Sequence, residues 1–146
     1  MKINMINNEY IQKLLNKLLD EYSMSEDFLL NLLKTDSIEK VKNYIIYQDE
    51  LSKDINNWNK WVNIILQFEY MMETNEDARV RGILNLLTEV YNINTAFIAK
   101  LANIKEDELL IFINESNSRL NYDIKYKIAS VAMNLSLTLR NSELNN

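Results

Sequence analysis

A pattern of apolar and aromatic residues occurs twice in this chain, about 69 positions apart, and this repeat most constrains the fold. The matched pairs are Tyr22 with Tyr91, Met24 with Ile93, Phe28 with Phe97, Leu29 with Ile98 and Leu32 with Leu101. Farther along, Val41 with Leu109, Tyr44 with Phe112 and Ile45 with Ile113 lie 68 positions apart, and Trp58 with Ile124, Val62 with Ile128 and Ile65 with Val131 lie 66 apart. Because nearly one spacing holds across several unlike segments, we interpret the pattern as an internal duplication.

Residues that break helices are almost absent from the chain. Proline does not occur, and Gly82 is the only glycine. Tight β-hairpins depend on such residues, whereas helices run without interruption when they are missing. We therefore predict an all-α fold of two helical units in tandem, residues 1–73 and 74–146, which share a core and contain about 8 to 9 helices.

Apolar residues at the three-and-four spacing of amphipathic helices place the individual elements. The predicted helices are residues 8–22, 25–33, 36–47, 58–72, 77–91, 95–102, 105–114 and 122–139. Ser25 is expected to be an N-cap. Asp36, with Glu39 three positions later, has the spacing of a capping box and is expected to begin the third helix. The polar stretch 48–57 is expected to be a connection.

Several classes of function are excluded by residues that the chain lacks. Histidine and cysteine are both absent, which rules out thiolate chemistry, disulfides and histidine proton shuttles. The run from Ser37 to Lys40 has the Ser-x-x-Lys spacing of some acyl-transfer enzymes, but this spacing is common in helices, and no glycine-rich loop supports it. We predict that the chain is not an enzyme and has no cofactor and no metal site.

The chain also lacks signals for membranes. No apolar run reaches the length of a membrane span, and Asn4, Asn7 and Asn8 interrupt the apolar N-terminus, where a signal peptide would have its apolar region. We therefore expect a cytoplasmic protein with no membrane partner.

The net charge argues against a protein whose entire surface attracts phosphate. The formal net charge is −5, and neither predicted unit is basic. A polyanionic partner would have to be bound by local clusters of lysine or arginine.

The segment NTAFIAKLANIK, residues 94–105, resembles the phage-repressor and Cro-like (XRE-type) helix-turn-helix family. In that family a small residue lies inside the second helix, where the third helix crosses it, and a turn residue follows four positions later. Ala99 and Asn103 occupy these positions, and asparagine tolerates the left-handed backbone that the turn requires. Leu109 and Phe112 match the apolar positions that seat the third helix.

The resemblance covers residues 80–140 well, and the first unit is a more degenerate copy. Leu30 stands where the small residue belongs, and Lys34 stands where the turn residue belongs. The resemblance therefore implies two helix-turn-helix units in tandem.

The resemblance also implies a function, since in this family the third helix enters the major groove of DNA and the second helix begins at a phosphate. It implies a sequence-specific transcription regulator of the phage or mobile-element type that binds double-stranded DNA, with a homodimer expected by analogy. The candidate DNA-binding residues are Lys34, Lys40, Lys42 and Asn43 in the first unit and Thr95 and Lys105 in the second. A mixed, solvated helix face is the other explanation of the lysines.

The third helix of the second unit favours a different partner. Glu106, Asp107 and Glu108 are adjacent carboxylates that would repel phosphate, and Leu110 and Ile111 lie among the same exposed positions. These five residues are candidates for binding a protein partner, so the alternative function is a protein-binding inhibitor or antirepressor, of the DNA-mimic or anti-defence type. The carboxylates could equally serve only to stabilise the helix N-terminus through the helix dipole.

Overall fold

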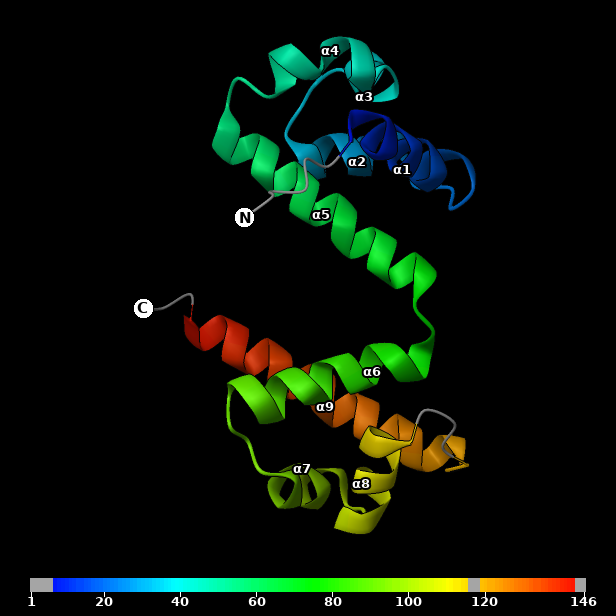
Figure 1. Cartoon of the computed structure of the whole chain (residues 1–146), viewed down its shortest axis with the longest axis vertical. Helices are drawn as coiled ribbons and strands as arrows, with labels where there is room; N and C mark the ends of the chain where they lie inside the picture. The colour runs from blue at the N-terminus through cyan, green and yellow to red at the C-terminus, as the bar shows by residue number, and fades with distance from the viewer. Residues whose placement is uncertain (1–6, 116–118, 144–146) are drawn as a thin grey trace. The chain divides into compact units, whose positions relative to one another are not determined.

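The computed structural model describes residues 7–115 and 119–143, and all regular elements in these ranges are helical (Figure 1). The prediction of an all-α fold is confirmed. The chain divides into two compact units, Met1–Glu73 and Thr74–Asn146.

Unit 1, Met1–Glu73, contains five α-helices in its described part. They are α1 (Asn8–Asp20), α2 (Glu26–Leu33), α3 (Ile38–Lys42), α4 (Tyr44–Leu51) and α5 (Ile55–Glu73). The prediction that Ser25 is an N-cap is confirmed, since its side-chain oxygen accepts a hydrogen bond from the amide of Phe28, 3.2 Å away. This bond satisfies one of the amides that a helix start leaves without a partner.

Two expectations for the third helix of unit 1 are wrong. Its N-cap is Ser37 and not Asp36, because the Ser37 hydroxyl accepts from the amide of Lys40 at 3.3 Å. The helix also ends after Lys42, because Asn43 leaves helical geometry with φ −117° and ψ 40°. The Asn43 side chain donates to the backbone oxygen of Glu39, a local bond that competes with continuation of the helix.

The connection predicted at residues 48–57 is largely helical. Helix α4 continues to Leu51, and α5 begins at Ile55. Leu51 packs against the core of unit 1, and the Asp54 carboxylate accepts from the amide of Asn57 at the start of α5. Apolar packing and a local cap therefore extend both helices into the polar stretch.

Unit 2, Thr74–Asn146, has four α-helices and one π-helical turn in its described part. They are α6 (Glu76–Asn85), η1 (Leu86–Val90), α7 (Thr95–Ala102), α8 (Glu106–Asn114) and α9 (Tyr122–Glu143). The helix predicted at 77–91 thus ends in a π turn. Thr88 lies in this turn, and its hydroxyl donates to the backbone oxygens of Leu84 and Asn85, a bond of the kind that disturbs the α-helical ladder.

Buried apolar side chains form two clusters, each from a single unit. The cluster of unit 1 contains Leu15, Leu29, Leu33, Val41, Tyr44, Trp61 and Ile65, among others. The cluster of unit 2 contains Leu84, Leu87, Ile98, Leu109, Phe112, Ile128 and Ala132, among others. Each unit therefore has a buried apolar cluster of its own.

The backbone repeats two unusual turns in the two units. Among the described residues other than glycine, only four have positive φ, and they form the pairs Ser23 with Asn92 and Lys34 with Asn103. Each pair lies 69 positions apart, as in the sequence pattern. The first pair follows the first helical segment of each unit, and the second pair ends α2 and α7.

Candidate nucleic-acid interface

The geometry of a helix-turn-helix is clearest between α7 and α8. Asn103 ends α7 with φ 55° and ψ 47°, in the left-handed region. The amide of Ile104 then donates to the backbone oxygen of Ala99, 3.1 Å away. Ala99 is buried, so a larger side chain would not fit between the two helices. The turn role predicted for Asn103 is confirmed.

Unit 1 forms the same turn with different residues. Lys34 ends α2 with φ 53° and ψ 46°, and the amide of Thr35 donates to the backbone oxygen of Leu30 at 3.1 Å. Thr35 and Asp36 separate Lys34 from the N-cap residue Ser37. In unit 2 a single residue, Ile104, separates Asn103 from the N-cap residue Lys105, so the turn of unit 1 is longer by one residue.

A polar side chain of the first helix holds the end of the third helix in each unit. Gln12 on α1 donates to the backbone oxygen of Val41 at 3.3 Å and accepts from the amide of Ile45 at 3.2 Å. Arg81 on α6 donates from Nε to the backbone oxygen of Phe112 at 2.8 Å. Gln12 and Arg81 are 69 positions apart, so equivalent positions perform equivalent roles.

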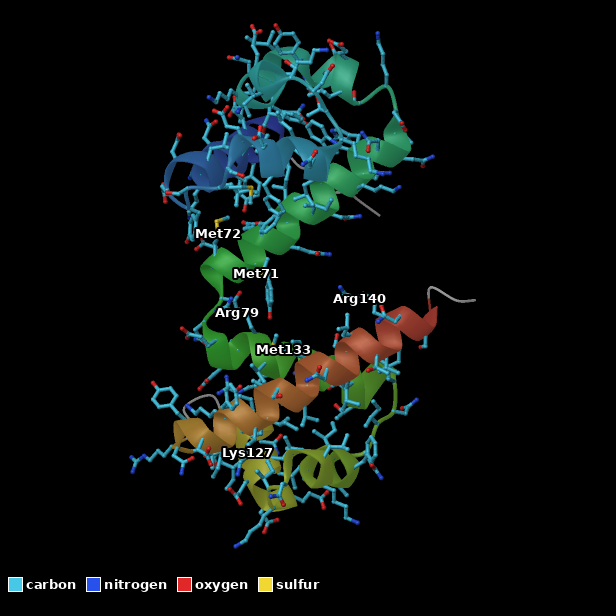
Figure 2. All side chains as sticks on the ribbon, turned by 180° about the vertical axis from the view of Figure 1, so that it is seen from behind. Met71, Met72, Arg79, Lys127, Met133 and Arg140 are labelled. Carbon is cyan, nitrogen blue, oxygen red and sulfur yellow. The ribbon has the colours of Figure 1, made fainter. Side chains whose placement is uncertain are left out.

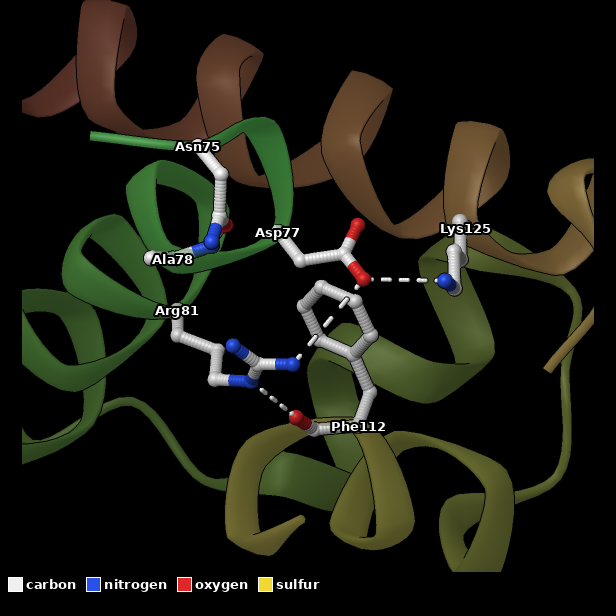
Figure 3. Close-up of polar contacts among 6 residues, drawn as sticks. All are labelled: Asn75, Asp77, Ala78, Arg81, Phe112 and Lys125. Atoms are coloured by element: carbon white, nitrogen blue, oxygen red, sulfur yellow. Dashed lines mark hydrogen bonds and ion pairs between the residues drawn. The ribbon is translucent and has the colours of Figure 1, made fainter. Parts of the chain in front are cut away.

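In unit 2 this contact belongs to a larger polar cluster, shown in Figure 3. The Arg81 guanidinium lies over the Phe112 ring, 5.1 Å from the ring centroid. Asp77 accepts from Lys125 on α9 at 2.8 Å and lies 3.9 Å from a terminal nitrogen of Arg81. The cluster therefore links α6, α8 and α9 around the end of the third helix.

Comparison with known proteins agrees with this geometry. Residues 6–145 match the model of a helix-turn-helix domain family. The chain belongs to this helix-turn-helix family. Neither a curated protein nor a solved structure matches it.

In unit 1 of this helix-turn-helix protein, the candidate lysines of α3 are paired with carboxylates. Lys40 lies 2.6 Å from Glu50 on α4, and Lys42 lies 2.7 Å from Glu26 on α2. The hydrogen bond to Glu50 raises the pKa of Lys40 above its ordinary value, which keeps the ammonium charged. Both pairs are exposed to solvent, so water screens the attraction and neither pair contributes much to stability.

Three further candidates lie at the turns and helix ends. Lys34 is exposed at the end of α2, and no described residue forms an ion pair with it. Thr95, the first residue of α7, donates from its hydroxyl to a carboxylate oxygen of Glu106 at 2.7 Å. The amide of Lys105 donates to the Glu108 side chain at 3.3 Å, and its own side chain is exposed.

The acidic start of α8 contacts Thr95, a residue that the sequence predicted to bind a DNA phosphate. Glu106 and Asp107 are exposed, and the Thr95 hydroxyl already donates its hydrogen bond to Glu106. Leu110 and Ile111 are also exposed, so the surface of α8 is acidic at its start and apolar in its middle.

The contacts of Gln12 and Arg81 were not predicted. A signal was present, because the two polar residues are 69 positions apart and lie between apolar positions of the first helices. Their partners are backbone atoms of distant helices, which the pattern of side chains does not reveal.

The described residues contain neither a candidate metal site nor a candidate membrane span. Within residues 7–115 and 119–143, no group of three or more acidic side chains is arranged to hold a metal ion. No helix in the described ranges has both the length and the apolar composition needed to cross a bilayer.

Proposed function

We propose that the chain is a nonenzymatic regulator that binds double-stranded DNA through unit 1. Membership of a helix-turn-helix family suggests DNA binding. The observation that carries the choice of unit is the contrast between the third helices: α3 carries Lys40 and Lys42, whereas α8 begins with three carboxylates. In this proposal α3 faces the major groove.

The ion pairs of α3 are compatible with this role. Lys42 and Glu26 are each about half exposed, at 50% and 51%, so water screens their attraction. A DNA phosphate can replace Glu26 or Glu50 as the partner of a lysine at little cost. Lys34 at the preceding turn adds a third cation, and Asn43 at the end of α3 is an exposed amide that can contact a phosphate or an adenine.

The net charge of unit 1 limits the affinity that these residues provide. Its acidic residues outnumber its lysines, so the surface around the lysines repels a duplex. We therefore expect weak binding that falls steeply as salt concentration rises. A Cro-like regulator of the phage or mobile-element type, produced by duplication of one module, is the specific form of this proposal.

Fluorescence anisotropy with mixed-sequence duplex DNA at several salt concentrations tests the proposal. Lys40→Gln with Lys42→Gln should reduce the slope of log affinity against log salt by about 0.9 for each lost phosphate contact. Lys53→Gln with Lys60→Gln is the matched control, since both lysines are exposed in unit 1 outside α3. An absence of DNA binding by the unaltered chain at low salt would overturn the proposal.

A second pair of variants separates a DNA contact from a structural role. Glu26→Gln or Glu50→Gln removes the carboxylate and leaves the lysine free to meet a phosphate. Either change should raise the affinity for DNA by more than Asp20→Asn, which removes an exposed carboxylate of unit 1 away from the two lysines. If the ion pair is merely structural, the increase should equal that of Asp20→Asn.

The Thr95–Glu106 contact favours a second candidate function, a protein-binding inhibitor or antirepressor. A carboxylate of the protein itself lies where the phosphate would meet the second helix, and exposed Leu110 and Ile111 lie farther along α8. In this proposal α8 mimics phosphates and binds a basic protein. The triple variant Glu106→Gln, Asp107→Asn, Glu108→Gln should no longer pull such a partner down from the native host. DNA binding by unit 1 should stay unchanged.

A further inference from the structure

Helix α9 of unit 2 has apolar residues on two faces, and only one of them is covered. The inner face packs against the core through Ile124, Ile128, Val131, Ala132, Leu135 and Leu139. On the outer face Tyr126, Met133 and Leu137 are 75%, 60% and 56% exposed. We call these three residues, with the small residues Ala129 and Ser130 between them, the α9 stripe.

The corresponding helix of unit 1 is polar at two of the three apolar positions of this stripe. At the spacing of 66 positions that relates α5 to α9, Lys60 corresponds to Tyr126 and Gln67 to Met133, and both residues of α5 are exposed. Leu137 corresponds to Met71, which is apolar and 45% exposed. The exposed apolar side chains of Tyr126 and Met133 therefore point to a role other than folding.

The α9 stripe has the shape and spacing of a seat for another helix. Its side chains, with Ile83 of α6 beside them, line a groove of about 670 Å³. Tyr126, Ser130, Met133 and Leu137 follow one another at intervals of four, three and four residues, the spacing of a coiled-coil seam. Figure 2 shows Met133 and Arg140 on one side of α9.

We propose that the α9 stripe is a self-association surface, on which α9 of a second copy of the chain packs antiparallel. A two-fold axis between Val131 and Ala132 places Tyr126 opposite Leu137 of the second copy and Ser130 opposite Met133. The same axis places Asp123 opposite Arg140, so each end of the seam joins opposite charges. This pairing is self-complementary, as a two-fold interface must be.

Charge selects the antiparallel direction. In a parallel pair, Asp123 would face Asp123 and Arg140 would face Arg140, and both contacts would be repulsive. Asp123 is highly exposed and its only ion pair among the described residues is with Lys127 at 3.4 Å, which leaves an oxygen available to a second cation. No described residue forms an ion pair with Arg140.

The size of the surface sets the expected affinity. From Asp123 to Arg140 the helix spans about 26 Å, which is enough for a small interface. Interfaces of this class associate weakly, so we expect a dissociation constant on the order of micromolar and a mixture of monomer and dimer. The proposal assigns a surface to the homodimer expected of a regulator, and it does not depend on which unit meets DNA.

Sedimentation velocity of the full chain over a wide range of concentrations tests the proposal. Met133→Glu or Leu137→Glu should weaken association by about tenfold or more, since each places a charge in the seam. Gln67→Glu is the matched control on α5 and should leave association unchanged. Both altered residues of α9 are exposed, so circular dichroism should show unchanged helix content.

Cysteine cross-linking tests the direction of the pair, because the chain has no cysteine of its own. Tyr126→Cys and Leu137→Cys chains should form a disulfide when mixed and not when each is alone. Arg140→Asp should weaken association, and adding Asp123→Arg should restore it.

Three results would overturn the proposal: a chain that stays monomeric at every concentration, association unaffected by Met133→Glu, or cross-links within each single-cysteine chain alone. A monomeric chain that still binds duplex DNA would overturn only this proposal and leave the proposed function standing.

Discussion

The indole nitrogen of Trp61 donates a hydrogen bond to the backbone oxygen of Leu33, 2.5 Å away, at the last residue of α2. Trp61 lies on α5 and is buried, so this bond joins the end of the second helix to the last helix of unit 1. The oxygens at a helix end lack partners within the helix. Trp61 supplies a donor for one of these oxygens, immediately before the left-handed turn at Lys34.

Trp61→Phe should therefore destabilise the protein by about 2 kcal/mol or more, because it leaves a buried oxygen without its donor and a small cavity in place of the second ring of the indole. The free energy of unfolding in urea, followed by circular dichroism, measures the effect. Tyr70→Phe, at a half-exposed position of the same helix, should change it by less than about 0.5 kcal/mol. Equal effects of the two substitutions would show that the bond is not important.

Arg81→Met should cost about 2 kcal/mol, since it removes the hydrogen bond to the Phe112 oxygen and the charge over the Phe112 ring while keeping an unbranched apolar stem. The matched control is Arg79→Met on the same helix, because Arg79 forms no ion pair with a described residue. Thermal melting of the two variants gives the comparison. A change in melting temperature for Arg79→Met as large as that for Arg81→Met would contradict the assigned role.

Glycine at the two left-handed turn positions should stabilise the protein unequally. The β-carbon of Lys34 is strained at φ 53°, so Lys34→Gly should add about 1 kcal/mol to the free energy of unfolding. Asn103→Gly should add less, because asparagine already tolerates this backbone. Lys34→Ala keeps the β-carbon and is the control, with stability expected to stay near that of the unaltered chain. Chemical denaturation of the three variants measures the order.

Stability should fall at alkaline pH in part because of Tyr44. Burial raises the pKa of its phenol above the ordinary value, and the hydrogen bond from the Trp58 indole, 2.8 Å from the phenol oxygen, acts in the opposite direction. A raised pKa in the folded state means that the neutral phenol is favoured on folding. Its contribution is complete below the unfolded pKa of about 10 and is lost as pH rises through the folded value.

Tyr44→Phe should therefore flatten the loss of stability between about pH 8 and about pH 11. At neutral pH it should cost about 1 kcal/mol, because the Trp58 indole loses its acceptor. Tyr70→Phe, at a half-exposed position of α5 in the same unit, is the control. Urea unfolding at the two pH values measures the free energy of unfolding. An unchanged dependence of that free energy on pH in Tyr44→Phe would refute the role assigned to the Tyr44 phenol.

Local signals in the sequence predicted part of the fold well. Helix α7 has the predicted bounds, Thr95–Ala102, because Asn94 caps its start and Asn103 ends it with a left-handed residue. Ser25 caps α2 for the same reason. In each case one residue contains the signal, and no distant contact is needed to interpret it.

Other features depend on contacts that the pattern of apolar residues does not contain. The apolar spacing continues through Asn43, yet the helix stops there because the Asn43 side chain bonds to Glu39. Asp36 and Ser37 are adjacent acceptors, and only the structure shows which of them reaches an amide. The sequence around Thr88 likewise does not predict the π turn in which this residue lies.

The candidate site was likewise predicted only in part from the sequence. The charges of Lys40 and Lys42 are visible in the sequence, but their partners Glu50 and Glu26 lie on other helices and could not be inferred from spacing. The bond between Thr95 and Glu106 joins two residues that the sequence had assigned to opposite roles. Residue type therefore predicted which groups matter, and the fold determined what each of them meets.

The turn before α3 is one residue longer than the turn before α8, with Thr35 and Asp36 in place of Ile104 alone. An additional residue adds up to about 3.5 Å of chain between the second and third helices. Positions in α3 and α8 therefore cannot be equated by the offset of 69 that relates the residues before the turn. A base contact found for one third helix would not transfer to the other simply by counting residues.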